Sequence, residues 1–510
     1  MSFASSRTTK LGCTFEPLAI TVSKASRKLG ITIPKRFISH MFLARHEAIR
    51  LALENESGSA TFLALPREWI AIPSALVRKL RIRHKSRVYV TLIEPLGPAR
   101  RPKRFLSGQL VDLLAFVPVV NSHERNYVVN EYRSATGEER LRLWCYHRRG
   151  SARQIDIRRY ANAREFGQFL GQYQAEGDKA DPHRVAFTNT LVSEHTDFVR
   201  FLRAIGIADE QVSVCAVYNP AKLDQRNLQT KLQRYVESTG VRIASVKPQK
   251  SMKGSYGFVT TVRSAILKGI LDSALRRVRK TLTGSQSASG TLELLKGFVE
   301  KLLTGDGTLD VSVRPTRIVT TVKILDRVEV FRRDYSAMLL TLGFAPRISD
   351  KRIEVRSHCR LDNLLTLYEM NAFRGTHNWI KLLCAVRLSL YGSINKGYEK
   401  LCRLAPQDRF TTLDVSKAFG TGTRSANLWI HSMMKRTLVQ QTSKFRGHSY
   451  ISYGLTDLGL HRVELLQNAL SEYETACNSL GKQDPLRLMD AVRARSRSKN
   501  VGETSAVPRD

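Results

Sequence analysis

Two acidic residues, each followed directly by glycine, stand at the ends of two similar apolar segments. Residues 169–178 read FLGQYQAEGD and residues 299–307 read VEKLLTGDG. Each segment has the apolar spacing of a helix, and Glu176 and Asp306 are 130 residues apart (306 − 176). An acid at a helix C-terminus faces the negative end of the helix dipole, which is mildly unfavourable. Its presence twice, once per compact subdomain, predicts that the two carboxylates act together.

Two carboxylates brought together are suited to holding a divalent cation. Without a metal they would repel each other, and one would tend to stay protonated. Mg²⁺ (or Mn²⁺) prefers oxygen ligands and keeps several waters, so one carboxylate from each subdomain plus phosphate oxygens is sufficient. A metal held there would activate water and stabilise charge on a phosphodiester. The alternative for either copy alone is a helix end with an incidental acid.

The charge of the whole chain indicates a polyanionic partner. The 510 residues include 82 Lys and Arg against 45 Asp and Glu, a formal net charge of +37. These cations are spread through folded-looking sequence and do not form one amphipathic helix, which favours nucleic acid over a membrane surface. No run approaches the about eighteen apolar residues of a membrane span, and the N-terminus lacks an apolar signal core.

Cysteine usage indicates a reducing compartment. The seven cysteines are scattered and never have CxxC spacing, which argues against a zinc site and against a disulfide framework. We therefore expect a cytoplasmic, nucleoid-associated protein.

The chain from about residue 161 to 395 reads as a duplication. The helical segments 198–206 and 335–343 correspond, and each ends in a glycine that suits a left-handed cap. Residues 310–314 and 352–356 alternate apolar with polar or basic side chains. This pattern predicts an α+β fold in which helices cover one face of antiparallel sheets and the other face is open and basic.

The acidic pair resembles the two motifs of a single-chain LAGLIDADG homing endonuclease. The resemblance implies a pseudo-twofold core in which two central motif helices cross between antiparallel saddle sheets. It implies catalytic and metal-binding roles for Glu176 and Asp306, with metal contacts from the backbone at Ala175 and Gly305. It also implies that the two helices meet through small residues, namely Gly171, Ala175, Gly177, Gly305 and Gly307. Lys301 is a departure, because glycine usually occupies that position, so its side chain must swing out or open the helix pair.

The same resemblance implies basic residues near the metal and on the sheets. Three lysines are candidates for the basic residue beside the acids: Lys250, Lys253 and Lys323. The candidates for DNA contact on the second sheet are Arg314, Arg317, Lys323, Arg352 and Arg356.

An N-terminal repeat of 39 residues separates the similar segments ITIPKRF and IAIPSAL, which contain Pro34 and Pro73 (73 − 34). Each is followed by a helical stretch and then an apolar strand. Over about residues 20–95 this resembles the AbrB-like swapped-hairpin fold, with two tandem copies forming a pseudo-dimer in one chain. A small β-rich domain with two similar turns is the alternative.

Residues 396–465 carry a second signature of DNA binding. A short helix that ends at Gly420 precedes a GTGT turn and a second helix, whose Leu428, Ile430, Met433 and Met434 are expected to face a core. A hairpin that closes on LTDLG follows. The segment resembles a MarR-type winged helix-turn-helix, which implies DNA contacts from the recognition helix and the wing at Thr423, Arg424, Ser425, Asn427, Lys444 and Arg446. A protein-interaction module is the alternative.

The sequence therefore predicts a multi-domain, monomeric protein that binds double-stranded DNA. The expected regions are an AbrB-like module (1–96), a linker and unassigned β-rich segment (97–160), two LAGLIDADG subdomains (161–285 and 286–395), a winged helix (396–480) and a basic tail (481–510). The favoured function is a free-standing, site-specific endonuclease. The alternatives are a non-cleaving regulator, as WhiA-type regulators are, and an RNA-splicing maturase.

Overall fold

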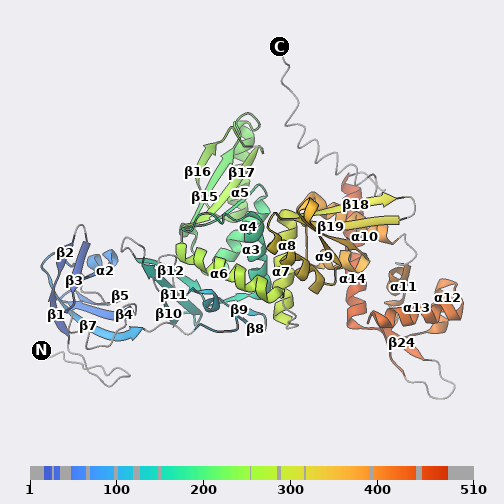
Figure 1. Ribbon diagram of the computed structural model, residues 1–510, viewed down its shortest axis with the longest axis horizontal. Helices are drawn as coiled ribbons and strands as arrows, with labels where there is room; N and C mark the ends of the chain where they lie inside the picture. The colour runs from blue at the N-terminus through green and yellow to red at the C-terminus, as the bar shows by residue number, and fades with distance from the viewer. Residues whose placement is uncertain are drawn as a thin grey trace, which may run out of the picture.

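The computed structural model describes most of the chain as a mixed α+β protein. The described residues are 17–25, 28–34, 48–64, 69–96, 101–118, 127–146, 152–252, 254–283, 289–314, 317–390, 396–443, 451–480 and residue 487. Figure 1 shows a β-rich module at the N-terminal end, a central region in which α3 and α7 lie side by side, and a helical region at the C-terminal end. In the described part of the chain, no helix has the length and apolar character needed to cross a bilayer.

The N-terminal module is built from two sheets around one hydrophobic core. Its elements are β1 (Leu18–Thr21), β2 (Ser23–Ala25), β3 (Lys28–Thr32), β4 (Ala48–Asn55), β5 (Gly58–Ala64), β6 (Trp69–Ala71), α2 (Ser74–Lys79) and β7 (Arg87–Leu96). Ile31 pairs with Ile70 and Ala52 pairs with Thr91, and both pairs are 39 residues apart (70 − 31 and 91 − 52). The two copies of the repeat therefore pair with each other about a pseudo-twofold axis.

The segment before the first motif helix packs into the central core. Its elements are β8 (Leu106–Ser107), β9 (Leu110–Asp112), η1 (Leu113–Phe116), β10 (Val128–Arg133), β11 (Glu139–Tyr146), β12 (Ala152–Arg158) and β13 (Tyr160–Asn162). Arg101 donates to the carbonyls of Val117 and Pro118, so residues 101–104 are held in place and do not act as the end of a linker. Asn162 then caps the first motif helix.

The first half of the duplicated region contains a four-stranded sheet and the helices around it. Its elements are α3 (Ala163–Glu176), β14 (Val185–Asn189), α4 (Val192–Ala204), η2 (Asp209–Gln211), β15 (Val212–Tyr218), α5 (Gln225–Thr239), β16 (Ile243–Pro248), β17 (Tyr256–Val262) and α6 (Ala265–Leu282). The strand order is β14-β17-β15-β16. Strands β15 and β16 are parallel, because α5 connects them as a crossover.

The second half has a simpler, fully antiparallel sheet of order β18-β19-β21-β20. Its elements are α7 (Ser289–Asp306), β18 (Gly307–Arg314), β19 (Arg317–Leu325), α8 (Glu329–Thr341), β20 (Pro346–Ser349), η3 (Asp350–Arg352), β21 (Glu354–Cys359), α9 (Leu361–Glu369) and α10 (His377–Ser389). The two halves share one turn: Asn189 and Asp326 end equivalent strands, and each side chain accepts from the backbone N–H two residues later.

Two details of the strand predictions differ from the structure. Ile353 was expected to face the core, but it adopts a left-handed φ of 53° after η3 and is 41% exposed. Glu354, expected on the polar face, is buried. The 3₁₀ turn before β21 shifts the start of the strand, so the alternation begins one residue later than the sequence suggests. The glycine caps behave as expected, since Gly206 and Gly343 have φ values of 89° and 81°.

The C-terminal region packs against α9 and α10. Its elements are α11 (Lys396–Leu404), β22 (Phe410–Thr411), α12 (Thr412–Phe419), α13 (Thr423–Lys435), β23 (Val439–Gln441), β24 (Ser452–Leu455) and α14 (Asp457–Leu480). The core face of α13 carries Ile430 and Met433, as expected. Leu428 is 66% exposed, against the prediction that it faces the core. It lies two residues before Ile430, and positions two apart on a helix do not share a face.

Candidate functional site

The two motif helices touch through their backbones at symmetric positions. A Cβ added at Gly167 would lie 2.2 Å from the carbonyl oxygen of Leu294. A Cβ added at Gly297 would lie 2.2 Å from the carbonyl oxygen of Arg164. The two contacts interchange under a shift of 130 residues (297 − 167 and 294 − 164), which is the separation of the two acids. The helices therefore cross about a pseudo-twofold axis. Neither glycine was singled out from the sequence, although their four-residue spacing from Gly171 and from Lys301 was visible.

The contact continues toward the carboxyl ends of both helices. A Cβ added at Gly171 would lie 2.2 Å from the carbonyl oxygen of Phe298, and one added at Gly305 would lie 2.6 Å from the Cβ of Ala175. Any larger side chain at these glycines would force the helices apart. Gly171, Ala175 and Gly305 thus lie at the helix contact, where the sequence analysis placed them.

The final glycine of each motif has a different role from the one expected. A Cβ added at Gly177 would lie 2.4 Å from the carbonyl oxygen of Tyr173, and one at Gly307 would lie 2.4 Å from that of Leu303. Both neighbours belong to the glycine's own helix. Gly177 and Gly307 therefore let the chain turn tightly out of each helix and are not needed for the contact between the helices.

The structure brings Glu176 and Asp306 together at the end of this contact. The Cβ position at Gly305, next to Asp306, is 3.8 Å from Oε1 of Glu176. Burial, the neighbouring Glu176 and Asp326 raise the pKa of Asp306 to about 6. Burial and the nearby Glu194 also raise the pKa of Glu176. A bound cation would offset this cost of holding two negative charges in a partly buried place.

Two further residues of this site were missed from the sequence. Lys179 donates to the carbonyl of Gln174 in the last turn of α3. Burial lowers the pKa of Lys179, and the charges of Asp306 and Asp326 act against that effect. Asp326 accepts a hydrogen bond of 3.1 Å from the Tyr335 hydroxyl. Lys179 follows the first motif by three residues and Asp326 ends a strand, but only the tertiary fold places them beside the acids.

The three lysines proposed from the sequence as the basic residue near the acids lie elsewhere or cannot be placed. Lys250 is exposed after β16. Lys323 points its ammonium at Asp310, with an N–O distance of 2.5 Å, on the second sheet. Lys253 lies outside the described residues. Lys179 is the cation that acts on Asp306.

The second sheet carries a row of cations across three strands. Lys323 on β19 is opposite Arg356 on β21, which is opposite Arg347 on β20. Arg352 is exposed in η3. The side chains of Arg314 and Arg317, at the end of the β18–β19 hairpin, lie outside the described part of the structure.

The equivalent row in the first half is neutral. Because Asn189 and Asp326 end equivalent strands, Ala186 corresponds to Lys323 (189 − 186 and 326 − 323), and it pairs with Thr261, which pairs with Ser213. Ala186 and Thr261 are buried. The two sheets therefore offer different surfaces to a ligand.

The candidate contacts of the C-terminal region are divided by the limits of the structure. Thr423, Arg424, Ser425 and Asn427 are all exposed at the start of α13. Lys444 and Arg446 lie outside the described residues. The exposed face of α13 is therefore polar and basic, with Leu428 as its apolar member.

The acid pair has a donor set that fits a small divalent cation. The carboxylates of Glu176 and Asp306 and the last carbonyls of two helices are all oxygen donors, which Mg²⁺ prefers. Within the described residues, His, Cys, Asp and Glu side chains form no group of three or more arranged to hold a metal ion. A metal at this place would thus need water or a substrate to complete its ligands.

Comparisons with known proteins give little. No family model matches the chain, and no curated protein matches it. Among solved structures the chain is similar to the crystal structure of MepR, a transcription regulator of the Staphylococcus aureus multidrug efflux pump MepA. The identity is 19%, the match covers 24% of this chain and 90% of that chain, and the TM-score is 0.17. A score of that size supports no conclusion about fold or function.

Proposed function

We propose that this protein is a metal-dependent, LAGLIDADG-type endonuclease that cleaves double-stranded DNA. The observation that carries the proposal is the meeting of Glu176 and Asp306 at the ends of two helices that cross about a pseudo-twofold axis. A pseudo-twofold pair of acids matches the two antiparallel strands of a duplex, one acid for each strand. The net charge of +37 supports a nucleic acid as the partner.

Glu176 and Asp306 would hold Mg²⁺ or Mn²⁺, together with the backbone carbonyls of Ala175 and Gly305. The metal would supply activation of water and stabilisation of charge on the phosphate. The partial burial of both acids makes their ionisation depend on a bound cation, because each raises the cost of charging the other.

The residues around the acids position them and balance their charge. Lys179 places a positive charge near Asp306 and Asp326. Gln174 donates to the Tyr335 hydroxyl, which donates to Asp326, at 3.1 Å in both cases. This chain of hydrogen bonds fixes Asp326 beside the acid pair, where its carboxylate can orient a water molecule.

Contacts outside the acid pair would hold the duplex. The row Lys323–Arg356–Arg347 supplies cations to phosphate groups on the side of the second half. The exposed start of α13 would reach base edges in a major groove. These contacts position the DNA, while the acids carry the chemistry.

A cleavage assay on randomised duplex libraries with Mg²⁺ or Mn²⁺ tests the proposal. Glu176→Gln and Asp306→Asn should each lower cleavage by at least about a hundredfold while binding is retained, since each removes a carboxylate that acts only in the chemical step. Binding without cleavage in the wild type and in both variants would reject the endonuclease.

A non-cleaving DNA-binding regulator is the second candidate, and one observation favours it. Lys179 already balances part of the charge of Asp306 and Asp326, so the cluster can persist without a metal. In that case Lys179→Met should weaken folding without revealing cleavage. If Lys179→Met changes the metal concentration needed for cutting, the site is a nuclease site.

A further inference from the structure

The second motif helix has one residue that its counterpart lacks, and its side chain leaves the helix contact. Gly297, Lys301 and Gly305 are spaced by four residues along α7. Gly297 and Gly305 face α3 closely, and the position equivalent to Lys301 in the first motif is Gly171 (301 − 130). Helix packing alone would favour a small residue here. Lys301 is nevertheless buried, so its side chain must find partners inside the protein.

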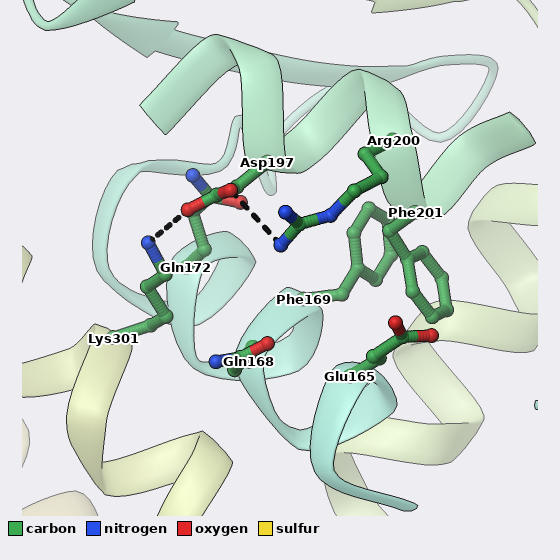
Figure 2. Close-up of a pocket in the computed structure, with 8 residues that line it drawn as sticks. All are labelled: Glu165, Gln168, Phe169, Gln172, Asp197, Arg200, Phe201 and Lys301. Carbon is green, nitrogen blue, oxygen red and sulfur yellow. Dashed lines mark hydrogen bonds and ion pairs between the residues drawn. The ribbon is translucent and has the colours of Figure 1, made fainter. Parts of the chain in front are cut away.

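Those partners belong to α4 in the other half of the duplicated region. The Lys301 ammonium lies 2.8 Å from Oε1 of Glu194 and 2.6 Å from Oδ2 of Asp197. Figure 2 shows Lys301 reaching from α7 to Asp197, with Arg200 on the other side of the same carboxylate at 3.0 Å. Burial alone would lower the pKa of Lys301, but the two carboxylates outweigh it and hold the pKa above its ordinary value.

The same cluster also reaches α3. Gln172 donates to Oε2 of Glu194 at 2.9 Å and to the Glu194 carbonyl at 2.6 Å. Glu194 thus accepts from both motif helices, from Lys301 on α7 and from Gln172 on α3. Gln172 lies one turn before Glu176, and Lys301 lies five residues before Asp306 (306 − 301). A shift of either helix along the other would break these bonds.

The opposite flank of the helix pair has an uncharged equivalent. Gln174 on α3 reaches across to Tyr335 on α8, which is the counterpart of α4 in the second half. Each motif helix is therefore held by a helix of the other half. On one flank the tie is a hydrogen bond between neutral groups, and on the other it is a buried ion cluster. Buried ion pairs contribute little net stability, and their best-attested role is to fix register.

We propose that Lys301, Glu194 and Asp197 form a register clasp, in which Lys301 is a positioning residue that fixes where α7 crosses α3 and so places Asp306 opposite Glu176. Its substrate-free role is the alignment of the acid pair, and the proposal rests on the juxtaposition of these acids and not on cleavage. Oily packing alone would let two glycine-faced helices slide by a turn, because their contacts repeat every four residues. A charge that has partners at only one register prevents that slip.

The test measures the juxtaposition directly in the full-length chain. The variant Glu176→Cys with Asp306→Cys is treated with a short bifunctional thiol reagent, and peptide mass spectrometry quantifies the 176–306 link over time. Adding Lys301→Met should slow the linkage by about tenfold or more, since a displacement of about 1 Å strongly reduces the rate of an oriented reaction. Lys296→Met is the matched control, because Lys296 lies on the same helix but pairs at 2.8 Å with Glu369 of its own half. It should leave the linkage rate unchanged.

Two further variants protect the test against simple unfolding. Lys301→Arg keeps the charge and should hold the linkage rate within about twofold of the parent. The charge exchange Lys301→Glu with Glu194→Lys should recover the rate that Lys301→Met loses. All rates are compared at temperatures where circular dichroism shows each variant folded.

The outcomes separate the two proposals. If Lys301→Met lowers the melting temperature but leaves the linkage rate unchanged, the cluster is only structural and the clasp is rejected. If the parent double-cysteine variant does not link, the juxtaposition is wrong and both proposals fail. If linkage behaves as expected but no DNA is cut, only the endonuclease is rejected.

Discussion

The two halves of the duplicated region agree at the helix pair and diverge at the sheets. At the helix pair, contacts interchange under a single shift of 130 residues. In the sheets, the first half has the α5–β16 insertion and a neutral row, whereas the second half has a hairpin and a row of cations. The helix pair leaves no room for change, because backbones touch there. The sheets face outward and can vary while the acid pair stays in place.

Substitution at the helix contact should produce the largest effect and tests its symmetry. Gly167→Leu and Gly297→Leu should each cost more than about 5 kcal/mol, because a side chain at 2.2 Å from a backbone oxygen must separate the helices. Urea unfolding measures both, with Gly254→Ala as control, since a Cβ there has its nearest neighbour at 3.8 Å. Unequal costs for the two leucine variants would show that the contact is not symmetric.

The ties on the two flanks of the helix pair should differ in strength. Lys301→Met leaves the buried Glu194 uncompensated and should cost about 3–5 kcal/mol. Tyr335→Phe removes one neutral hydroxyl and should cost about 1 kcal/mol. Thermal and urea unfolding of both variants compare them. A larger loss for Tyr335→Phe would reverse the assignment of the ionic flank as the dominant one.

The acids should cost stability where they serve chemistry. The pKa of Asp306 is about 6 in the folded chain against 3.8 as the ordinary value. The folded state therefore binds more protons between these values, and stability falls as the pH rises through that window. Asp306→Asn should raise stability at pH 7.5 by about 1 kcal/mol after allowance for solvent screening, and by less at pH 5. A variant that is less stable than the wild type at pH 7.5 would contradict this.

The two sheets should respond differently to loss of a side chain. Arg356→Gln should reduce the slope of log affinity against log salt for a duplex by about 1, because one phosphate contact is lost. Thr261→Val, at the equivalent position of the first half, should leave that slope unchanged. Fluorescence anisotropy at several salt concentrations measures both. Equal changes of slope would mean that the halves bind the backbone alike.

Much of the fold follows from local patterns in the sequence. The glycine caps at Gly206 and Gly343, the strand and helix order of both halves, and the 39-residue repeat all follow from periodicity and turn residues. Leu428 and Ile353 were misplaced for the same reason, because a pattern of apolar residues does not reveal which one falls off the buried face when a helix or strand begins one residue later.

The sequence by itself determined the elements, the charge of the chain and the two acids with the glycines that follow them. Only the tertiary structure decided that Lys301 turns toward α4, that Lys179 and Asp326 join the acids, and that Gly167 and Gly297 touch the opposite helix. The physical reason is range. Hydrogen bonding and apolar spacing act within a few residues, whereas these contacts join positions more than a hundred residues apart and depend on how two helices cross.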